Sequence, residues 1–329
     1  MQKTAHIKKF FFPHVALLIS TLIWALAGTV IKITLHHIPP ITFLYFRFLI
    51  VCILILPYTI WELGKTKINP KDYLNFFLLG VFSQTAVTLV FFALKYTTVM
   101  DATIIGVLST VLAVYAGHYF YKEKLSKNLT LGLVIASLGT FVVFLEPLLS
   151  GIKNHISPQT RVFGNFLEVI YALTWLMYVI WSKMSMGEDS GRLKKTLSFI
   201  HLKPMTKKYP SNLIVSMTFY IGLITLVPLL ILEGVGLFGP YTFNLLALDS
   251  IGLLGLLYMA ILSSITAYFL YQWGLENSHV STCAIYGYLS PIFALPFAYI
   301  FLSEIPNIYM LLGGAFIAAG VIIAEVNNT

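Results

Sequence analysis

The sequence alternates long apolar runs with short breaks that carry charges, prolines, glycines or asparagines. A bilayer core of about 30 Å is crossed by roughly 20 helical residues, and the apolar runs have that length. The pattern therefore predicts an all-α polytopic membrane protein. It predicts ten transmembrane helices, near residues 14–37, 41–61, 72–96, 99–121, 128–146, 162–184, 212–235, 249–276, 280–302 and 306–325.

The second half of the chain repeats the first, because residues 81–143 and 262–324 align without a gap at a constant offset of 181. The matched positions include Ser83 with Ser264, Thr85 with Thr266, Gly106 with Gly287, Ser109 with Ser290, Glu123 with Glu304, Gly132 with Gly313 and Gly139 with Gly320. Five helices per repeat is an odd number, so the second repeat is expected to cross the membrane in the opposite sense. Inverted repeats are typical of secondary transporters, which bind their solute near the midplane between the repeats.

Composition and charge agree with this class and predict an orientation. Hydrophobic residues make up 58% of the chain and charged residues 10%, and the mean hydropathy is +0.85, so too few polar side chains exist to cover a soluble globule. Sixteen of the 21 Lys and Arg residues fall on the side of the N-terminus and three on the other side. The positive-inside rule then predicts a cytoplasmic (inner) membrane protein with both termini in the cytoplasm. The net charge of +8 is a topology signal and predicts no nucleic-acid partner.

The predicted helix 162–184 carries a polar and aromatic stripe. Glu168, Tyr171, Trp175, Tyr178 and Ser182 are spaced three and four residues apart in alternation, which places all five on one helix face. A charge in the hydrocarbon region is costly and usually faces a cavity or a partner, so we expect this face to line a solute path. For the aromatic members, ordinary helix packing or an interfacial belt is the alternative.

Two tryptophans occupy matching places in the two repeats. Trp24 and Trp175 each precede a lysine by eight residues, Lys32 and Lys183 respectively. We expect the two indoles to face each other across the central chamber and to contact the solute.

Two pairs of polar residues add hydrogen-bonding groups at a four-residue spacing, Gln84 with Thr88 and Tyr268 with Gln272. Their amides and hydroxyls suit a zwitterionic or polyhydroxyl solute. The alternative is hydrogen bonding between neighbouring helices, which is the commoner role of isolated polar residues in membranes.

Small residues form matching stripes in the predicted helices 99–121 and 280–302. Gly106 and Gly117 belong to the first helix, and Gly287 and Pro291 belong to the second. Small side chains allow backbones to approach closely, so tight helix packing is the expected role and a cavity wall is the alternative. Pro291 also predicts a kink in its helix, whereas the first repeat has Thr110 at that position.

Arg47 and Glu168 are the strongest candidates for gating or coupling. Each lies roughly 10 Å from the same membrane surface, at 1.5 Å per helical residue, so the two could form an ion pair in one conformation. In the alternative reading, Arg47 reaches the headgroups and Glu168 meets water. In a third reading, Glu168 carries a proton, because burial raises the pKa of a carboxyl group into a useful range.

The sequence lacks the residue patterns of metal sites, phosphate-binding loops and catalytic sites. His36, His37 and His118 form no set with ligand spacing, so we predict no metal site. Cys52 and Cys283, the two cysteines, fall inside apolar runs and are expected to pack as small apolar side chains. Phosphate-binding glycine loops, catalytic triads and paired catalytic carboxylates are also missing from the sequence, which predicts neither a cofactor nor an enzyme.

A set of motifs in a fixed order resembles the EamA-type permeases of the drug/metabolite transporter superfamily. The first half carries Trp24, Pro40, Arg47-Phe48, Ala93-Leu94-Lys95-Tyr96-Thr97, Glu123, Gly132 and Gly139. The second half carries Trp175, Gly274-Leu275, Ser290-Pro291, Glu304, Gly313-Gly314 and Gly320. The resemblance covers nearly the whole chain. It implies ten helices in two inverted repeats and transport of small metabolites without ATP hydrolysis.

We therefore expect a cytoplasmic N-terminus at 1–13, a first EamA-like repeat at 14–146, an outer linker at 147–161 and a second repeat at 162–329. A basic cytoplasmic insertion at 185–211 is longer than the usual link of the family. It is expected to be either a disordered linker or a short helix at 193–202 on anionic lipid.

The expected function is a secondary transporter that moves a small metabolite, an amino acid or another amphipathic solute, by alternating access. A small-molecule sensor and a membrane enzyme that acts on lipids are the alternatives. The expected partners are the solute and the lipid bilayer, with proton coupling through Glu168 left open, and the sequence carries no signal for an oligomeric state.

Overall fold

The apolar runs are helical in the computed structural model of the protein, which describes residues 2–122, 127–149, 157–188, 191–199, 202–239, 243–245 and 248–325. The first half contains α1 (Gln2–Thr34), α2 (Pro40–Lys65), a 3₁₀ turn (Pro70–Asp72), α3 (Tyr73–Tyr96), α4 (Val99–Tyr121) and α5 (Lys127–Leu149). The second half contains α6 (Pro158–Ser185), α7 (Gly191–Phe199), α8 (Ser211–Gly234), α9 (Ser250–Leu257), a π-helical segment (Tyr258–Thr266), α10 (Ala267–Glu276), α11 (Val280–Gly287), α12 (Ser290–Leu302) and α13 (Ile308–Glu325). The prediction of an all-helical chain is confirmed for these residues.

Eight helical segments of the described chain are long and apolar enough to cross a membrane. In the region of the last two predicted spans, the apolar helices are shorter, at Ser290–Leu302 and Ile308–Gly320. The count of ten spans therefore stays a prediction.

Two predicted helices are not continuous α-helices. The run 249–276 contains the π-helical segment between α9 and α10. The run 280–302 is interrupted between Gly287 and Ser290, and Pro291 lies in the first turn of α12. Proline suits that place, because a first-turn residue has no intrahelical partner for its N–H. The expected kink at Pro291 is thus a full break just before it.

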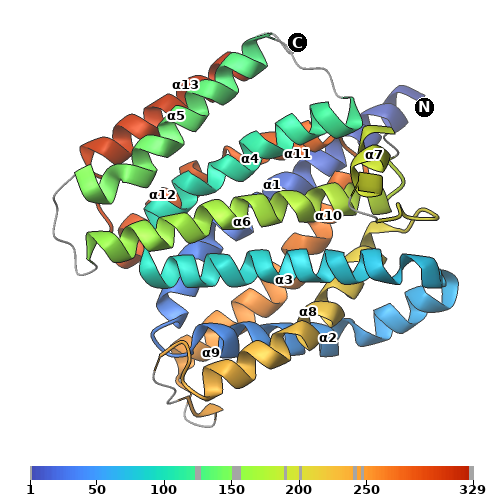
Figure 1. Cartoon of the computed structure of the whole chain (residues 1–329), viewed down its shortest axis with the longest axis horizontal. Helices are drawn as coiled ribbons and strands as arrows, with labels where there is room; N and C mark the ends of the chain where they lie inside the picture. The colour runs from blue at the N-terminus through green and yellow to red at the C-terminus, as the bar shows by residue number, and fades with distance from the viewer. Residues whose placement is uncertain are drawn as a thin grey trace.

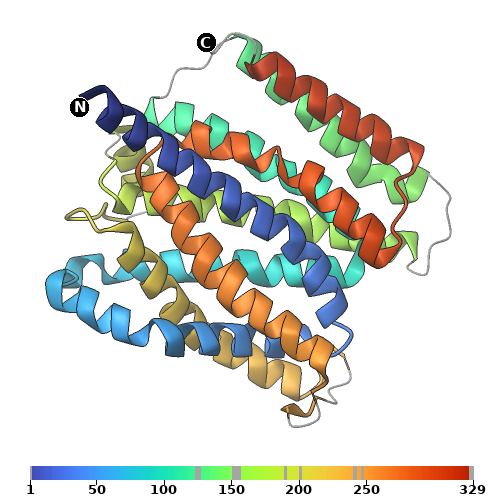
Figure 2. The same cartoon turned by 180° about the vertical axis from the view of Figure 1, so that it is seen from behind.

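Helices of one half pack on helices of the other half, and many of these pairs match under the duplication. α3 packs on α6 as α10 packs on α1, and α4 packs on α6 as α12 packs on α1. α5 lies beside α13 at one edge of the bundle, and α2 lies beside α8 toward the other edge (Figures 1 and 2). These contacts between halves have counterparts made by the equivalent helices, as a duplicated chain predicts, whereas the contact of α5 with α6 has no counterpart of similar extent between α13 and α1.

The helix α12 runs antiparallel to α4, whose repeat equivalent includes it. Glu304 follows the end of α12, and its carboxylate accepts hydrogen bonds from the backbone N–H groups of Val99 (2.9 Å) and Met100 (3.0 Å) at the start of α4. The end of α12 therefore meets the start of α4. Glu123, the repeat equivalent of Glu304, lies outside the described residues.

Two lysines make equivalent contacts in the two halves. The Lys32 ammonium donates a hydrogen bond to the carbonyl of Thr97, just past α3. The Lys183 ammonium donates to the carbonyls of Leu275 (2.8 Å) and Ser278 (2.7 Å), at the end of α10. Thr97 and Ser278 are equivalent at the offset of 181, so the duplication seen in the sequence extends to contacts between helices.

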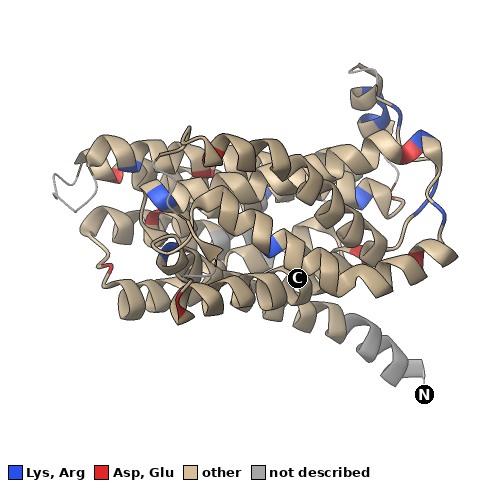
Figure 3. Ribbon diagram, turned by 90° about the horizontal axis from the view of Figure 1, so that it is seen from below, with Lys and Arg blue, Asp and Glu red and all other residues tan. Residues whose placement is uncertain are grey.

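The basic insertion is ordered over most of its length, in contrast to a disordered linker. Leu193 and Leu197 of α7 are buried against the protein, so the apolar face of this helix does not rest on lipid. After α7, the side chain of Asp72 accepts hydrogen bonds from the Thr206 N–H (2.9 Å), the Thr206 hydroxyl (2.6 Å) and the Tyr209 hydroxyl (2.7 Å). The insertion is thereby attached to the start of α3. α7 carries Arg192, Lys194 and Lys195, and Lys and Arg residues are concentrated at one end of the ribbon (blue in Figure 3). We call this end of the bundle, with the loop 66–72 and the insertion, the basic end.

Candidate functional site

A cavity of about 220 Å³ lies between the two halves. Residues of α1, α2, α3, α4, α6, the π-helical segment, α10, α11 and α12 line it. Six of the candidate solute-binding and coupling residues are among them: Trp24, Arg47, Glu168, Tyr171, Trp175 and Tyr268.

Aromatic rings form one continuous wall of the cavity. The Trp24 and Trp175 rings meet edge to face with their centroids 5.7 Å apart. Tyr268 and Tyr271 lie 5.3 and 5.2 Å from the Trp24 ring. The Trp24 indole N–H donates to the carbonyl of Ser263 at 3.0 Å, which fixes the orientation of the ring. The structure brings the two tryptophans together, but they touch within one wall and do not face each other across the chamber as their matching sequence positions suggested. It also adds Tyr271 to this wall, a residue that the sequence analysis missed.

Arg47 and Glu168 bring a guanidinium and a carboxyl group to the cavity, and each residue is only 2% exposed. The Arg47 Nε donates to the hydroxyl of Ser264 at 2.6 Å, and the guanidinium lies 5.8 Å from the centre of the Phe91 ring. The Glu168 Oε2 has no hydrogen-bond partner within the described residues. A buried carboxylate oxygen without a partner carries a desolvation cost that a bound cationic group would relieve.

Arg47 and Glu168 form no ion pair in this conformation, and Arg47 is hydrogen-bonded to Ser264. Both side chains are buried, so Arg47 does not extend to the surface here, and Glu168 lines the cavity.

Four of the candidate residues bond to neighbouring side chains and do not line the cavity. The Gln272 amide donates to the Tyr178 hydroxyl (2.5 Å) and to the Ser182 hydroxyl (3.0 Å), which joins α10 to α6. The Gln84 amide donates to the Thr88 hydroxyl at 2.9 Å within α3. For these groups the structure favours the packing alternative over solute contact in this conformation.

The small-residue stripes serve both expected purposes. Gly106 and Gly287 line the cavity, whereas Gly117 and Pro291 do not. A Cβ on Gly106 would lie 3.3 Å from the Glu168 Oε1, and a Cβ on Gly287 would lie 2.2 Å from the Thr110 Oγ1. The absence of a Cβ at Gly106 and Gly287 therefore allows close packing and also leaves room at the cavity wall.

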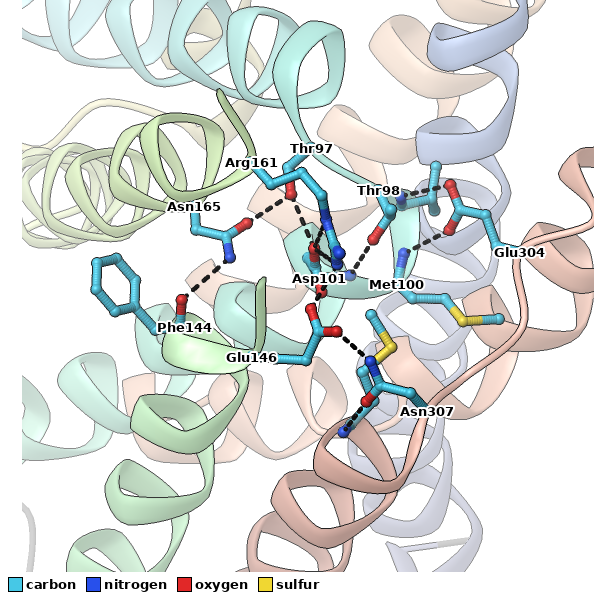
Figure 4. Close-up of polar contacts among 12 residues, drawn as sticks. Thr97, Thr98, Met100, Asp101, Phe144, Glu146, Arg161, Asn165, Glu304 and Asn307 are labelled. Carbon is cyan, nitrogen blue, oxygen red and sulfur yellow. Dashed lines mark hydrogen bonds and ion pairs between the residues drawn. The ribbon is translucent and has the colours of Figure 1, made fainter. Parts of the chain in front are cut away.

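A buried polar cluster lies where α4 and α6 begin (Figure 4). The Arg161 guanidinium bridges the carboxylates of Asp101 (2.6 Å) and Glu146 (2.5 Å), and all three side chains are at most 2% exposed. The Asn307 amide donates to Glu146 and extends the cluster to the start of α13. From the sequence, Arg161 is one of the three Lys and Arg residues assigned to the side opposite the N-terminus, where an exposed loop charge would be expected. A carboxylate in the first turn of a membrane helix, Asp101, was the signal that could have revealed the cluster.

The site offers binding groups and a path between helices. Within the described residues, no three His, Cys, Asp or Glu side chains are grouped so that they could hold a metal ion. The bundle of membrane-length apolar helices and the enclosed aromatic and charged chamber define a multi-pass membrane transporter.

The chain belongs to the EamA-like transporter family, whose profile matches residues 12–145 and 196–325. An uncharacterized transporter from Archaeoglobus fulgidus is 28% identical over 94% of this chain and 95% of its own length. A probable amino-acid metabolite efflux pump from Salmonella typhimurium is 27% identical over 93% of this chain and 92% of its own. A protein of known crystal structure superposes with a TM-score of 0.62 at 16% identity, covering 95% of this chain and 96% of that one, and this likeness bears on the fold alone. The protein is therefore a multi-pass membrane permease and not an enzyme.

Proposed function

We propose that the protein is a secondary transporter that carries a small zwitterionic, amphipathic solute, such as a neutral amino acid, across the cytoplasmic membrane by alternating access. The solute occupies the central cavity. Its carboxylate pairs with Arg47, its ammonium group meets Glu168, and its apolar part packs on the aromatic wall. The observation that carries this proposal is the presence of one buried cation and one buried, incompletely bonded carboxylate in the same aromatic chamber.

The size of the cavity supports a small solute. Pockets for drug-sized ligands occupy roughly 300–1,000 Å³, whereas this cavity has about 220 Å³. The names of the relatives from Salmonella typhimurium and Escherichia coli, both probable amino-acid metabolite efflux pumps, agree with an amino acid or its derivative.

The proposed mechanism rests on ten helices in two inverted repeats with both termini in the cytoplasm. The profile of the family matches the chain in two segments, and the antiparallel placement of α4 and α12 supports the inversion. The charge distribution supports a cytoplasmic position for the basic end, because Lys and Arg residues of the loop 66–72 and of the insertion lie there. Alternating access then consists of rocking one half against the other around the cavity.

A flux assay tests the proposal. Purified protein in liposomes is preloaded with unlabelled L-leucine or L-phenylalanine, and counterflow of the labelled amino acid is measured. We expect counterflow for the wild type, its loss in Arg47→Ala and in Glu168→Gln, and wild-type rates in Arg192→Ala, which removes an exposed arginine at the basic end. Liposomes that contain only this protein also separate a permease from a sensor or a lipid-acting enzyme. Absence of flux for every neutral amino acid would refute the proposed solute class.

Glu168 is also our candidate for proton coupling, because its Oε2 has no partner among the described residues. A carrier proton would occupy this carboxyl group when the solute is absent. Coupling predicts that an imposed pH gradient drives net uptake in the wild type and drives none in Glu168→Gln. Net uptake that ignores both the gradient and an uncoupler would exclude coupling at this residue.

A further inference from the structure

The π-helical segment Tyr258–Thr266 interrupts a membrane helix beside the cavity. Met259 and Ser263 from this segment line the chamber, and Ser263 accepts the indole hydrogen bond of Trp24. π-helical geometry is rare and frequently occurs at functional sites, because it is less favourable than the α-helix and is retained where it presents particular groups.

The first repeat shows that the shared serine and threonine alone do not produce this geometry. The equivalent residues 77–85 form a regular part of α3, although both stretches contain a serine and a threonine separated by one residue. In the second repeat, the hydroxyls of Ser264 and Thr266 donate to carbonyls five residues earlier, Met259 (2.8 Å) and Ile261 (3.2 Å). A five-residue spacing is that of the π-helix. Contacts specific to the second repeat therefore accompany the wider helix.

The contact that distinguishes Ser264 comes from the other half of the protein. The Arg47 Nε on α2 donates to the Ser264 hydroxyl at 2.6 Å, and the same hydroxyl donates to the Met259 carbonyl. Both hydrogen-bonding functions of the hydroxyl are thus used. Because Ser264 accepts from the Nε, its position sets the plane in which the Arg47 guanidinium lies.

We propose that Ser264, held by the π-helical segment, is a positioning residue that orients Arg47 to receive the carboxylate of the solute. This inference rests on the proposed function, in which Arg47 binds that carboxylate. Ser264 itself is absent from the cavity lining and acts through Arg47. Without the hydroxyl, the buried guanidinium loses a charge-assisted hydrogen bond and its fixed orientation, so recognition of a carboxylate weakens.

Binding of two probes that differ in the carboxylate tests the inference. Tryptophan fluorescence of the purified protein, with Trp24 and Trp175 in the cavity wall, is titrated with L-phenylalanine and with phenylethylamine, which lacks the carboxylate. We expect Ser264→Ala to weaken phenylalanine binding by roughly tenfold or more, the equivalent of one hydrogen bond to a charged group, and to leave phenylethylamine binding unchanged. Ser264→Thr keeps the hydroxyl and should retain most of the affinity.

Controls separate positioning from a general loss of structure. Ser216→Ala removes a buried serine hydroxyl that donates to the Asn212 carbonyl within α8, and the variant should bind both probes as the wild type does. In the Arg47→Ala background, Ser264→Ala should cause no further loss of phenylalanine affinity. Equal weakening of both probes by Ser264→Ala, unchanged phenylalanine affinity, or additive losses in the double variant would each overturn the inference. If the wild type does not distinguish the two probes, the carboxylate role of Arg47 fails first, and the proposed solute class fails with it.

Discussion

Replacing Gly287 with alanine tests how closely α11 and α4 approach each other at the cavity. The new Cβ would lie 2.2 Å from the Thr110 Oγ1 but 3.4 Å from the Thr110 Cβ, which is an ordinary contact distance. The helices must therefore separate by roughly 1 Å, or Thr110 must change rotamer. Overpacking of this kind costs about 1–3 kcal/mol of folding free energy. Thr110→Ala removes the clashing hydroxyl, so the double variant should recover most of that loss.

The assay is thermal unfolding of the purified variants in detergent, followed by tryptophan fluorescence. Gly314→Ala is the matched control, because a Cβ there meets nothing within 4 Å. We expect a lower midpoint for Gly287→Ala, a near wild-type midpoint for Gly314→Ala, and a coupling of about 1–2 kcal/mol between Gly287→Ala and Thr110→Ala. A stable Gly287→Ala variant, or a double variant whose loss equals the sum of the single losses, would show that the two helices do not meet at these residues.

Three further changes test the contacts that hold the bundle together. Arg161→Ala leaves the buried carboxylates of Asp101 and Glu146 without their cation and should lower the free energy of unfolding by about 3–5 kcal/mol. Neutralising both acids in the same variant should recover much of that loss. A loss below about 1 kcal/mol would contradict the buried cluster. Glu233→Ala removes the acceptor of two backbone N–H groups at the start of α2 and should cost about 1–3 kcal/mol for each group. Glu233→Gln, which keeps one acceptor oxygen, should lose less, and equal losses would argue against capping. Asp72→Ala removes the anchor of the basic insertion, so trypsin should cleave the insertion faster in inside-out vesicles; an unchanged cleavage rate would show that the anchor contributes little.

The helices and the tryptophan pair could be predicted from the sequence because both follow from local periodicity. An apolar run of membrane length forms a helix wherever the backbone has no water to bond with. Trp24 and Trp175 each precede a lysine by eight residues, which identifies them as equivalent positions of the two repeats. The structure places the centres of the two rings 5.7 Å apart. Pattern and symmetry were sufficient at these positions.

The directions of individual polar groups could not be predicted, because they depend on which helix lies opposite. Tyr178 shares a helix face with Glu168 and Trp175, yet its hydroxyl accepts a hydrogen bond from Gln272 and the residue lies outside the cavity lining. The π-helical segment was equally hidden, since its serine and threonine recur in α3 without changing that helix. Asp72 shows the same limit, because it anchors a segment more than 130 residues away in the sequence.

The paired lysine contacts, Lys32 with Thr97 and Lys183 with Ser278, have a consequence for energetics. Both contacts are formed in this conformation. Opening one end of the bundle would break one of them, and opening the other end would break its repeat equivalent, so the two openings carry a similar cost. We expect the inward-facing and outward-facing arrangements to be close in free energy for this reason. A cargo molecule then needs only modest preferential affinity to tip the balance, since about 1.4 kcal/mol changes the ratio of two states tenfold.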